Sequence, residues 1–329
     1  MTASPAIAPA STGATASALA RSLTPLVGLL VVVLFFLAVP PHHAVTLEQV
    51  RTIGVHAVIV GVAALGATIV IAAGGLDLSV GSMIALTGVT ASLVLRAGHG
   101  ATTAVAAAVA VGLACGLYNG LLITILRLPA FIVTLGTLGF FRGAAKWLTS
   151  SRTVSAPTLS LESIVAPRPP APWMLVAPAV WILLLLAAAS AFVLHRTVLG
   201  RHALALGGNE QAARRCGVPI TGTRVAVYAI AGALAGLAGL FQFARLQSGD
   251  PTVAIGVELD VIAAVVIGGA SLSGGSASVL GTLAGAFMIA YLRNRCVVMG
   301  WPNYVQEMIV GHLIILAVAV DLWRRRRTG

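Results

Sequence analysis

Asp77 is the most conspicuous residue that could do chemistry, because a lone carboxylate interrupts a long apolar region there. It lies in the run Gly74-Gly75-Leu76-Asp77-Leu78-Ser79-Val80-Gly81-Ser82, which separates apolar stretches at roughly 53–73 and 83–95. A charge at such a depth in a membrane is costly and usually functional. Non-helical backbone is tolerated there only where protein or a water-filled cavity surrounds it. The run therefore predicts a broken helix or a tight turn that lines a path or braces the core.

A second glycine-rich run is similar to the first. Residues 268–276 read Gly-Gly-Ala-Ser-Leu-Ser-Gly-Gly-Ser, identical to 74–82 at six of nine positions. Paired glycine interruptions in the two halves of a transporter point to its central site, although two runs rich in serine and glycine can also agree by chance. The candidate residues for lining or bracing a path are Gly75, Asp77, Ser79, Asn119, Ser271 and Ser273. For Asn119, a hydrogen bond between helices is the simpler interpretation.

Motifs for ATP binding, zinc proteolysis and serine hydrolysis are absent from the sequence. Lys146 is the only lysine, and Trp147 follows it, so no G-x-x-x-x-G-K-[ST] loop can bind ATP. The adjacent His42 and His43 suit a solvated turn better than a metal site, and the three cysteines lack metal-ligand spacing. We therefore expect no metal or cofactor on this chain, and a membrane-embedded enzyme is the remotest function class.

The composition predicts a polytopic membrane protein. Of the 329 residues, 58% are hydrophobic and only 9% are charged, whereas about a quarter of a soluble domain is charged. The mean hydropathy is +1.00. The net charge of +11 comes almost entirely from arginines that cluster in a few connections. Such clusters beside apolar spans indicate the cytoplasmic side of a membrane rather than a nucleic-acid surface.

The elements that must position these residues are about ten membrane spans in an all-α bundle. The apolar runs place the spans at about 23–39, 51–72, 82–95, 101–126, 129–149, 173–194, 225–243, 259–270, 277–293 and 304–322. We expect residues 1–22 to be a disordered cytoplasmic tail, 23–323 one transmembrane domain, and 324–329 a basic cytoplasmic tail. Ten spans with both ends cytoplasmic agree with every arginine cluster except Arg142 and Lys146. These two residues can either snorkel to the headgroups or pair with a partner protein.

Glycines and a few acidic residues give further clues to the packing. Gly112, Gly116 and Gly120 share one helix face, and Gly232 and Gly236 repeat the four-residue spacing. Such faces allow two helix backbones to approach closely. Glu258 and Asp260 can pair with arginines on the outer side, in a structural or a functional role.

The longest polar connection, 195–224, carries five arginines and is expected in the cytoplasm. Within it, Glu210–Arg215 contains good helix formers, Asn209 can cap that helix, and Gly217 can end it. We therefore predict a short helix lying across the cytoplasmic face.

Three blocks of the sequence resemble the permease subunits of ribose-type ABC importers. They are Gly74–Thr87, Asn119–Thr137 with its Leu-Pro-Ala-Phe-Ile-Val-Thr-Leu-Gly-Thr run, and Gly207–Gly217 followed by Glu258–Gly285. The resemblance extends over roughly 45–320. It implies a ten-span helical fold in the bacterial inner membrane, with two permease subunits, identical or different, per transporter. It also implies two ATPase subunits that carry ATP and Mg²⁺, and a periplasmic or surface protein that delivers a monosaccharide or polyol.

The resemblance also assigns roles to residues of the short helix. Glu210, Ala212, Ala213 and Gly217 match the Glu-x-Ala-Ala-x-x-x-Gly loop that docks into the ATPase. Together with Asn209, Arg214 and Arg215 they form the expected coupling segment, in which the two arginines contact the ATPase or face water. A neutral sugar needs hydrogen-bonding groups rather than charge, so we expect Asp77 to brace a helix N-terminus rather than contact the sugar.

Two other transport functions stay open at this point. A permease of the branched-chain amino acid type shares the broad architecture, but its zwitterionic substrate favours more charge along the path than the few intramembrane carboxylates provide. An ion-coupled secondary transporter needs a proton or sodium site and no ATPase-docking loop. The sequence does not identify the sugar.

Overall fold

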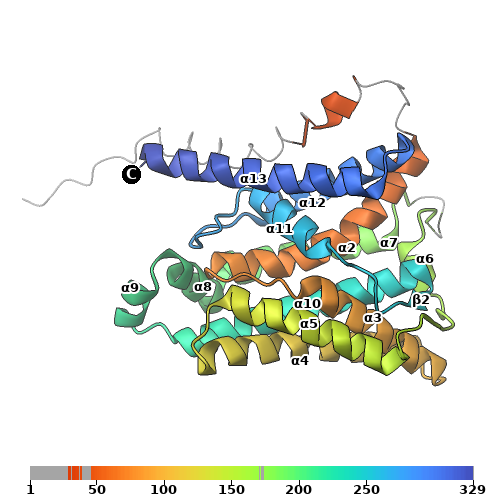
Figure 1. The fold of residues 1–329 in the computed structure, drawn as a ribbon, viewed down its shortest axis with the longest axis horizontal. Helices are drawn as coiled ribbons and strands as arrows, with labels where there is room; N and C mark the ends of the chain where they lie inside the picture. Colours follow the sequence, from red (N-terminus) through yellow and green to blue (C-terminus); the bar gives the residue numbers. More distant parts are fainter. Residues whose placement is uncertain are drawn as a thin grey trace, which may run out of the picture.

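The structure, a computed structural model, describes residues 29–30, 32–36, 38, 46–169, 171 and 174–328, and the burial of side chains as far as Val320. The expected tail over 1–22 and most of the expected first span over 23–39 lie outside these residues, as do His42 and His43. The described chain is mostly helical (Figure 1).

The helices follow one another with short connections. In chain order they are α2 (Leu47–Ala72), α3 (Val80–Arg96), α4 (Ala101–Ile125), α5 (Ala130–Thr149), α6 (Leu161–Val165), α7 (Pro178–Arg196), α8 (Val198–Gly208), α9 (Glu210–Arg215), α10 (Ile220–Leu246), α11 (Val257–Ile267), α12 (Val279–Val298) and α13 (Asn303–Thr328). Two short strands, β1 (Val154–Ser155) and β2 (Ser248–Gly249), pair antiparallel with Val154 opposite Gly249.

The helices fall close to the predicted spans from the second onward. Among the described residues, α2, α4, α7, α10 and the part of α13 up to Val320 are long and apolar enough to cross a membrane, and α3 is a shorter apolar helix. The all-α membrane bundle is therefore confirmed, while the number of ten spans stays a prediction.

Helix α2 is the centre of the bundle. In its most apolar window 94% of the residues are buried, which suits a helix that is apolar on all sides. Helix α10 runs antiparallel beside it, since His56 near the start of α2 contacts Arg245 near the end of α10. Further along, Gly66 of α2 faces Ala231 of α10.

The predicted close approach of helices through glycine is confirmed between α4 and α10. A Cβ atom at Gly112 would collide with backbone of Gly232 and Gly236, and one at Gly116 would collide with backbone of Tyr228. Both glycine series of the sequence therefore belong to one contact, in which two antiparallel backbones touch without intervening side chains.

The described chain contains two similar series of elements in opposite orientations. In the first, the long helix α2 is followed by the non-helical segment 73–79, α3, α4 and α5. In the second, α10 is followed by the segment 247–256, α11, α12 and α13. Because α2 and α10 are antiparallel, the two series are inverted. The counterpart of 73–79 is thus 247–256, which corrects the interpretation of 268–276 as the equivalent run: that run connects α11 to α12.

The structure gives Arg142 a partner that differs from both expected alternatives, and it confirms that Asp260 pairs with an arginine. Arg142 of α5 neither extends to the lipid headgroups nor needs a partner protein, because it is bound within the chain. Its Nη1 donates to the carbonyl oxygens of Pro251 at 2.9 Å and Val253 at 2.6 Å. Asp260 does pair with an arginine, Arg293 of α12 at 2.8 Å, but its side chain is only 2% exposed. Arg142 therefore holds segment 247–256 in place, and Arg293 holds α11 in place. Lys146 is exposed.

The two ends of the bundle differ. Helices α8 and α9 and the C-terminal end of α13, which contains the four arginines 324–327, lie at one end, on the left in Figure 1. We call this the α9 end. The strand β2 and α6 lie at the opposite end, together with the start of α2.

Candidate functional site

The segment 73–79 is a local scaffold built around Asp77. Gly74 has φ +76°, a conformation that favours glycine. The Asp77 side chain is buried, and its Oδ1 accepts hydrogen bonds from the Ser79 backbone N–H at 2.9 Å and the Ser79 hydroxyl at 2.6 Å. Ser79 is the N-cap residue of α3, so the carboxylate fixes the residue at which the helix begins.

Three neighbouring helices hold the same segment. Asn119 of α4 donates from Nδ2 to the Ser79 hydroxyl at 2.9 Å. The Tyr228 hydroxyl of α10 donates to the Leu76 carbonyl at 3.0 Å, and Thr134 of α5 donates to the same carbonyl at 3.3 Å. The sequence led us to select Asp77, Ser79 and Asn119, and the structure brings these three together. Tyr228 and Thr134 were missed, because nothing in their spacing connects them to Leu76.

The second run forms a tight turn elsewhere. Ser271 is buried, its backbone N–H donates to Ser276 at 3.2 Å, and its carbonyl accepts from Gly274 at 2.9 Å. The hydroxyl of Ser271 also accepts from the Ser273 backbone N–H at 3.3 Å. Ser271 and Ser273 thus help to shape their own turn.

Both runs nevertheless meet at Gly207 of α8. A Cβ atom at Gly207 would lie 2.6 Å from the Gly275 nitrogen and 2.9 Å from the Gly74 nitrogen. The Gly275 N–H also donates at 3.0 Å to the carbonyl of Ala72, the last residue of α2. We call Gly74, Gly207, Gly274 and Gly275 the glycine junction. It joins the end of α2, the α11–α12 turn and α8 through backbone alone.

The short helix expected in the long connection is confirmed as α9. The Asn209 Oδ1 accepts from the Ala212 N–H at 2.9 Å, and Gly217 follows the helix with φ +79°. Ala213 is buried, whereas Glu210, Gln211, Ala212, Arg214 and Arg215 are exposed. One face therefore packs on the bundle while the other is open.

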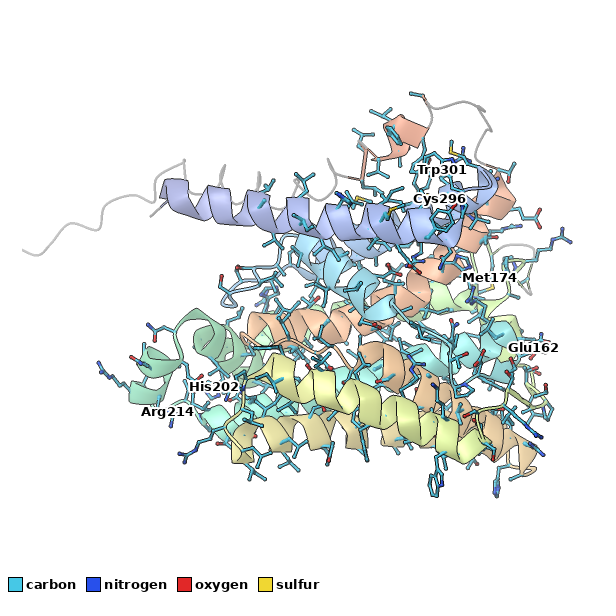
Figure 2. All side chains as sticks on the ribbon, in the orientation of Figure 1. Glu162, Met174, His202, Arg214, Cys296 and Trp301 are labelled. Atoms are coloured by element: carbon cyan, nitrogen blue, oxygen red, sulfur yellow. The ribbon has the colours of Figure 1, made fainter. Side chains whose placement is uncertain are left out.

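Glu210 ties α9 to α10. Its carboxylate is 3.2 Å from Arg214 on its own helix and 2.9 Å from Arg224 on α10. Ion pairs this exposed contribute little stability, so their main effect is to orient the side chains. Figure 2 shows Arg214 at the outermost part of the α9 end.

A cavity of about 770 Å³ lies between α9 and segment 73–79. We call it the α9 cavity. Its lining comes from segment 73–79, the end of α4, the start of α5, α9, the start of α10 and the α11–α12 turn: Gly74, Gly75, Leu76, Ile123, Thr124, Arg127, Leu128, Pro129, Ala130, Phe131, Glu210, Arg214, Ile220, Thr221, Arg224 and Leu272. Glycines of the first run and a residue of the second therefore face the same space.

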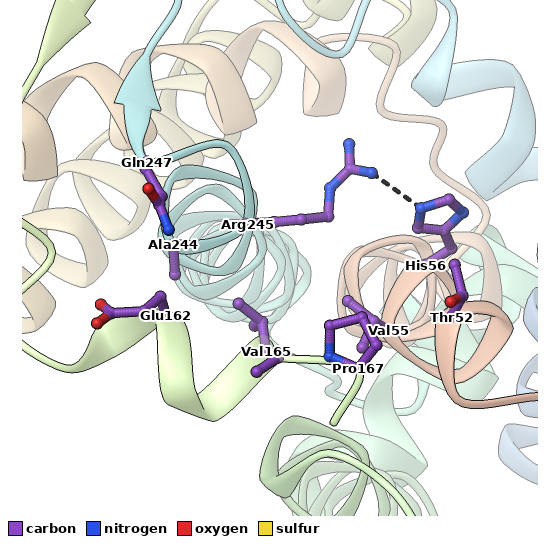
Figure 3. Close-up of a pocket in the computed structure, with 10 residues that line it drawn as sticks. Thr52, Val55, His56, Glu162, Val165, Pro167, Ala244, Arg245 and Gln247 are labelled. Carbon is purple, nitrogen blue, oxygen red and sulfur yellow. Dashed lines mark hydrogen bonds between the residues drawn. The ribbon is translucent and has the colours of Figure 1, made fainter. Parts of the chain in front are cut away.

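A smaller cavity of about 310 Å³ lies at the opposite end, between α2, α6 and α10 (Figure 3). Arg245 donates from Nη1 to the Nε2 of His56 at 2.9 Å, shown as the dashed line in Figure 3. Glu162 and Gln247 line the same space. A guanidinium, an imidazole, a carboxylate and an amide can together hydrogen-bond hydroxyl groups. These residues lie far apart in the sequence, so no spacing could have revealed the cavity.

The side chains that can bind metal ions, among them three cysteines, are not clustered in the described part of the chain. No group of three or more His, Cys, Asp or Glu side chains could hold an ion there. Cys115 and Cys296 are buried, whereas Cys216 is exposed directly after α9.

Comparison with known proteins gives a family and several relatives. Residues 50–318 match the family described as "Branched-chain amino acid transport system / permease component". The ribose import permease protein RbsC of Escherichia coli (strain K12) is 40% identical over 262 residues, which cover 78% of this chain and 80% of RbsC. The autoinducer 2 import system permease protein LsrC of Photorhabdus laumondii is 32% identical over 302 residues, covering 92% and 89%.

A further LsrC protein, from Yersinia pestis (strain Pestoides F), is 35% identical over 257 residues that cover 78% of this chain and 72% of the relative. No solved structure matches the chain. The family match extends over most of the chain, and the relatives cover most of their own length, so the resemblance includes the bundle, both glycine runs and α9. The chain therefore belongs to the ribose-type permeases of ABC importers, which are transport subunits of the membrane and not enzymes.

Proposed function

We propose that this chain forms the path through which an ABC importer moves a monosaccharide or a related polyol across the bacterial inner membrane. A periplasmic or surface binding protein delivers the sugar, and separate ATPase subunits, which bind ATP and Mg²⁺, supply the energy. A second permease subunit completes the path. The names of the relatives support this substrate class, since one imports ribose and the others import autoinducer 2.

The position and form of α9 carry the proposal. A short helix with a capped start, one buried face and one open face projects at the end that also contains the arginines of α13. Arginine-rich segments beside membrane spans favour the cytoplasmic side, which supports a cytoplasmic position for the open face, where an ATPase can bind. Ala212 on that face is small enough to enter a groove.

The glycine junction supplies a mechanical connection from α9 to the path. When the ATPase moves α9, α8 moves with it, and Gly207 presses on backbone of both glycine runs. Close packing transmits such a displacement rather than absorbing it. Asp77, Ser79 and Asn119 keep segment 73–79 in one shape during this motion.

The path itself needs hydrogen-bonding groups for a neutral ligand. Asp77 is turned towards Ser79, so it braces the segment and leaves contact with sugar hydroxyls to other groups. The polar cavity beside His56 and Arg245 at the opposite end is suited to receive the sugar from the binding protein.

Coupling is tested by changing the open face of α9 without changing the fold. In vesicles that contain the permease with its ATPase and binding protein, Ala212→Trp should reduce ATP-driven ribose uptake at least tenfold, because the ring cannot enter the docking groove. Ala212→Ser is the matched control and should retain uptake. Both variants should reach the membrane in normal amounts, and the tryptophan variant should no longer retain the ATPase during purification. Normal uptake by Ala212→Trp would end the proposal.

The substrate class is tested in the same vesicles. The family description favours branched-chain amino acids as the second candidate. Labelled ribose and labelled leucine are therefore offered separately, each with a binding protein of matching specificity. We expect ATP-dependent uptake of the sugar, and uptake of leucine alone would assign the chain to the amino acid group.

A further inference from the structure

The α9 cavity has an excess of positive charge. Three arginines line it, one from each of the α4–α5 connection, α9 and α10: Arg127, Arg214 and Arg224. Glu210 is the only acidic residue among the lining side chains, and it is paired with both Arg214 and Arg224. The formal charge of the lining is therefore +2, concentrated around one cavity.

Arg127 has the guanidinium most available to a ligand. It has a positive φ of +53° two residues after the end of α4, and its side chain is exposed. Within the described part of the chain, no hydrogen bond or ion pair involves its side chain. The guanidinium is free to bind an acceptor in the cavity, and its planar fork suits phosphate oxygens.

Two helix N-termini add to the positive potential. Helix α5 begins at Ala130 and α10 begins at Ile220, and the first residues of both line the cavity. Neither helix has a side-chain hydrogen bond at its N-cap, where a proline stands in each case. The first-turn N–H groups of long helices attract anions. Here they support a site that the three arginines define.

We propose that the α9 cavity binds a phosphate monoester. Its volume of about 770 Å³ lies within the range of about 300–1,000 Å³ that is typical of small-ligand sites. A dianionic phosphate would bridge Arg127 to Arg214 and Arg224, and would compete with Glu210 for the last two. The bound anion would thereby join α9 to the starts of α5 and α10 and fix the segment that the ATPase must move. Only this effect on transport depends on the proposed function; binding itself does not.

The phosphate can come from a soluble sugar phosphate or from a lipid headgroup. The full-length chain, without ATPase, is placed in phosphatidylcholine nanodiscs and titrated calorimetrically with ribose 5-phosphate, with ribose as the uncharged control. Nanodiscs that contain phosphatidic acid test the lipid source through the thermal unfolding temperature. Because no transport is measured, failure here leaves the proposed function untouched.

Arg127→Gln should weaken the binding of ribose 5-phosphate at least tenfold, whereas Arg152→Gln, which changes an exposed arginine at the opposite end, should leave it unchanged. Glu210→Gln should strengthen binding, since it removes the competing carboxylate. In the unmodified protein, inorganic phosphate should displace ribose 5-phosphate. If the site is a lipid site, phosphatidic acid instead raises the unfolding temperature in an Arg127-dependent manner. The proposal is overturned if neither ligand binds with dependence on Arg127, or if ribose binds as well as its phosphate.

Discussion

At the scale of single residues, Asp77 shows how a costly buried carboxylate can serve as a brace. Its Oδ1 takes both hydrogen bonds from Ser79, and Ser79 in turn receives one from Asn119. This network ends at the N-cap of α3, where the chain changes from the non-helical segment 73–79 to a helix. The role we assign to Asp77 is therefore to accept hydrogen bonds, and its negative charge is secondary.

This role separates two substitutions. Asp77→Asn keeps an oxygen that can accept from Ser79, so we expect near-normal uptake and stability. Asp77→Ala leaves the Ser79 N–H buried without a partner, which costs about 1–3 kcal/mol. Stability is measured by thermal unfolding in detergent, and transport is measured as ribose uptake. If Asn is as damaging as Ala, the charge itself is needed and the bracing role is wrong.

The sequence predicted part of this network and not the rest, for a physical reason. Asp77 and Ser79 are two residues apart, so their contact is local and can be expected from the turn. The contacts of Tyr228 and Thr134 with Leu76 depend on how α10 and α5 pack beside the segment. That packing is a property of the folded chain and leaves no pattern in the local sequence.

At the scale of elements, the glycine junction determines how α8 meets the bundle. Gly207 and Gly208 are neighbours in α8, but their surroundings differ sharply. A Cβ atom at Gly207 would collide with the Ala72 carbonyl and lie 2.6 Å from the Gly275 nitrogen. A Cβ atom at Gly208 would have its nearest neighbour at 4.0 Å.

This difference supplies a matched pair of variants. Gly207→Ala should force α8 away from both glycine runs and reduce ATP-driven ribose uptake at least tenfold. Gly208→Ala adds the same methyl group one residue later and should be tolerated. Uptake is compared at equal amounts of permease in the membrane. Equal uptake by the two variants would show that the close contact at Gly207 does not transmit motion.

Helices and glycine faces were predictable, whereas the relation between the two glycine runs was not. Long apolar segments define α4 and α10, and the four-residue glycine spacing required a close partner for each. The similarity of 74–82 and 268–276 suggested equivalent positions in two halves. The inverted order of elements shows instead that 247–256 is the equivalent of 73–79. The six identical residues of the two runs are explained by tight backbone packing, since both runs contact Gly207.

At the scale of the whole molecule, the two ends of the bundle carry different structural features. The α9 end contains α9, which we propose docks to the ATPase, together with the glycine junction and the positively charged cavity. The opposite end contains the small polar cavity beside α6 (Figure 3). Coupling through α9 requires the first end to face the cytosol, and this orientation rests on the distribution of arginines.

Cys216 allows that orientation to be measured directly. It is exposed directly after α9, whereas Cys115 and Cys296 are buried, so a membrane-impermeant maleimide should react with Cys216 alone. The reagent is applied to right-side-out and to inside-out membrane vesicles, with Cys216→Ser as the control that removes the signal. We predict labelling in inside-out vesicles and none in right-side-out vesicles. Labelling of Cys216 from the outer side would contradict an importer that is driven from the cytosol through α9.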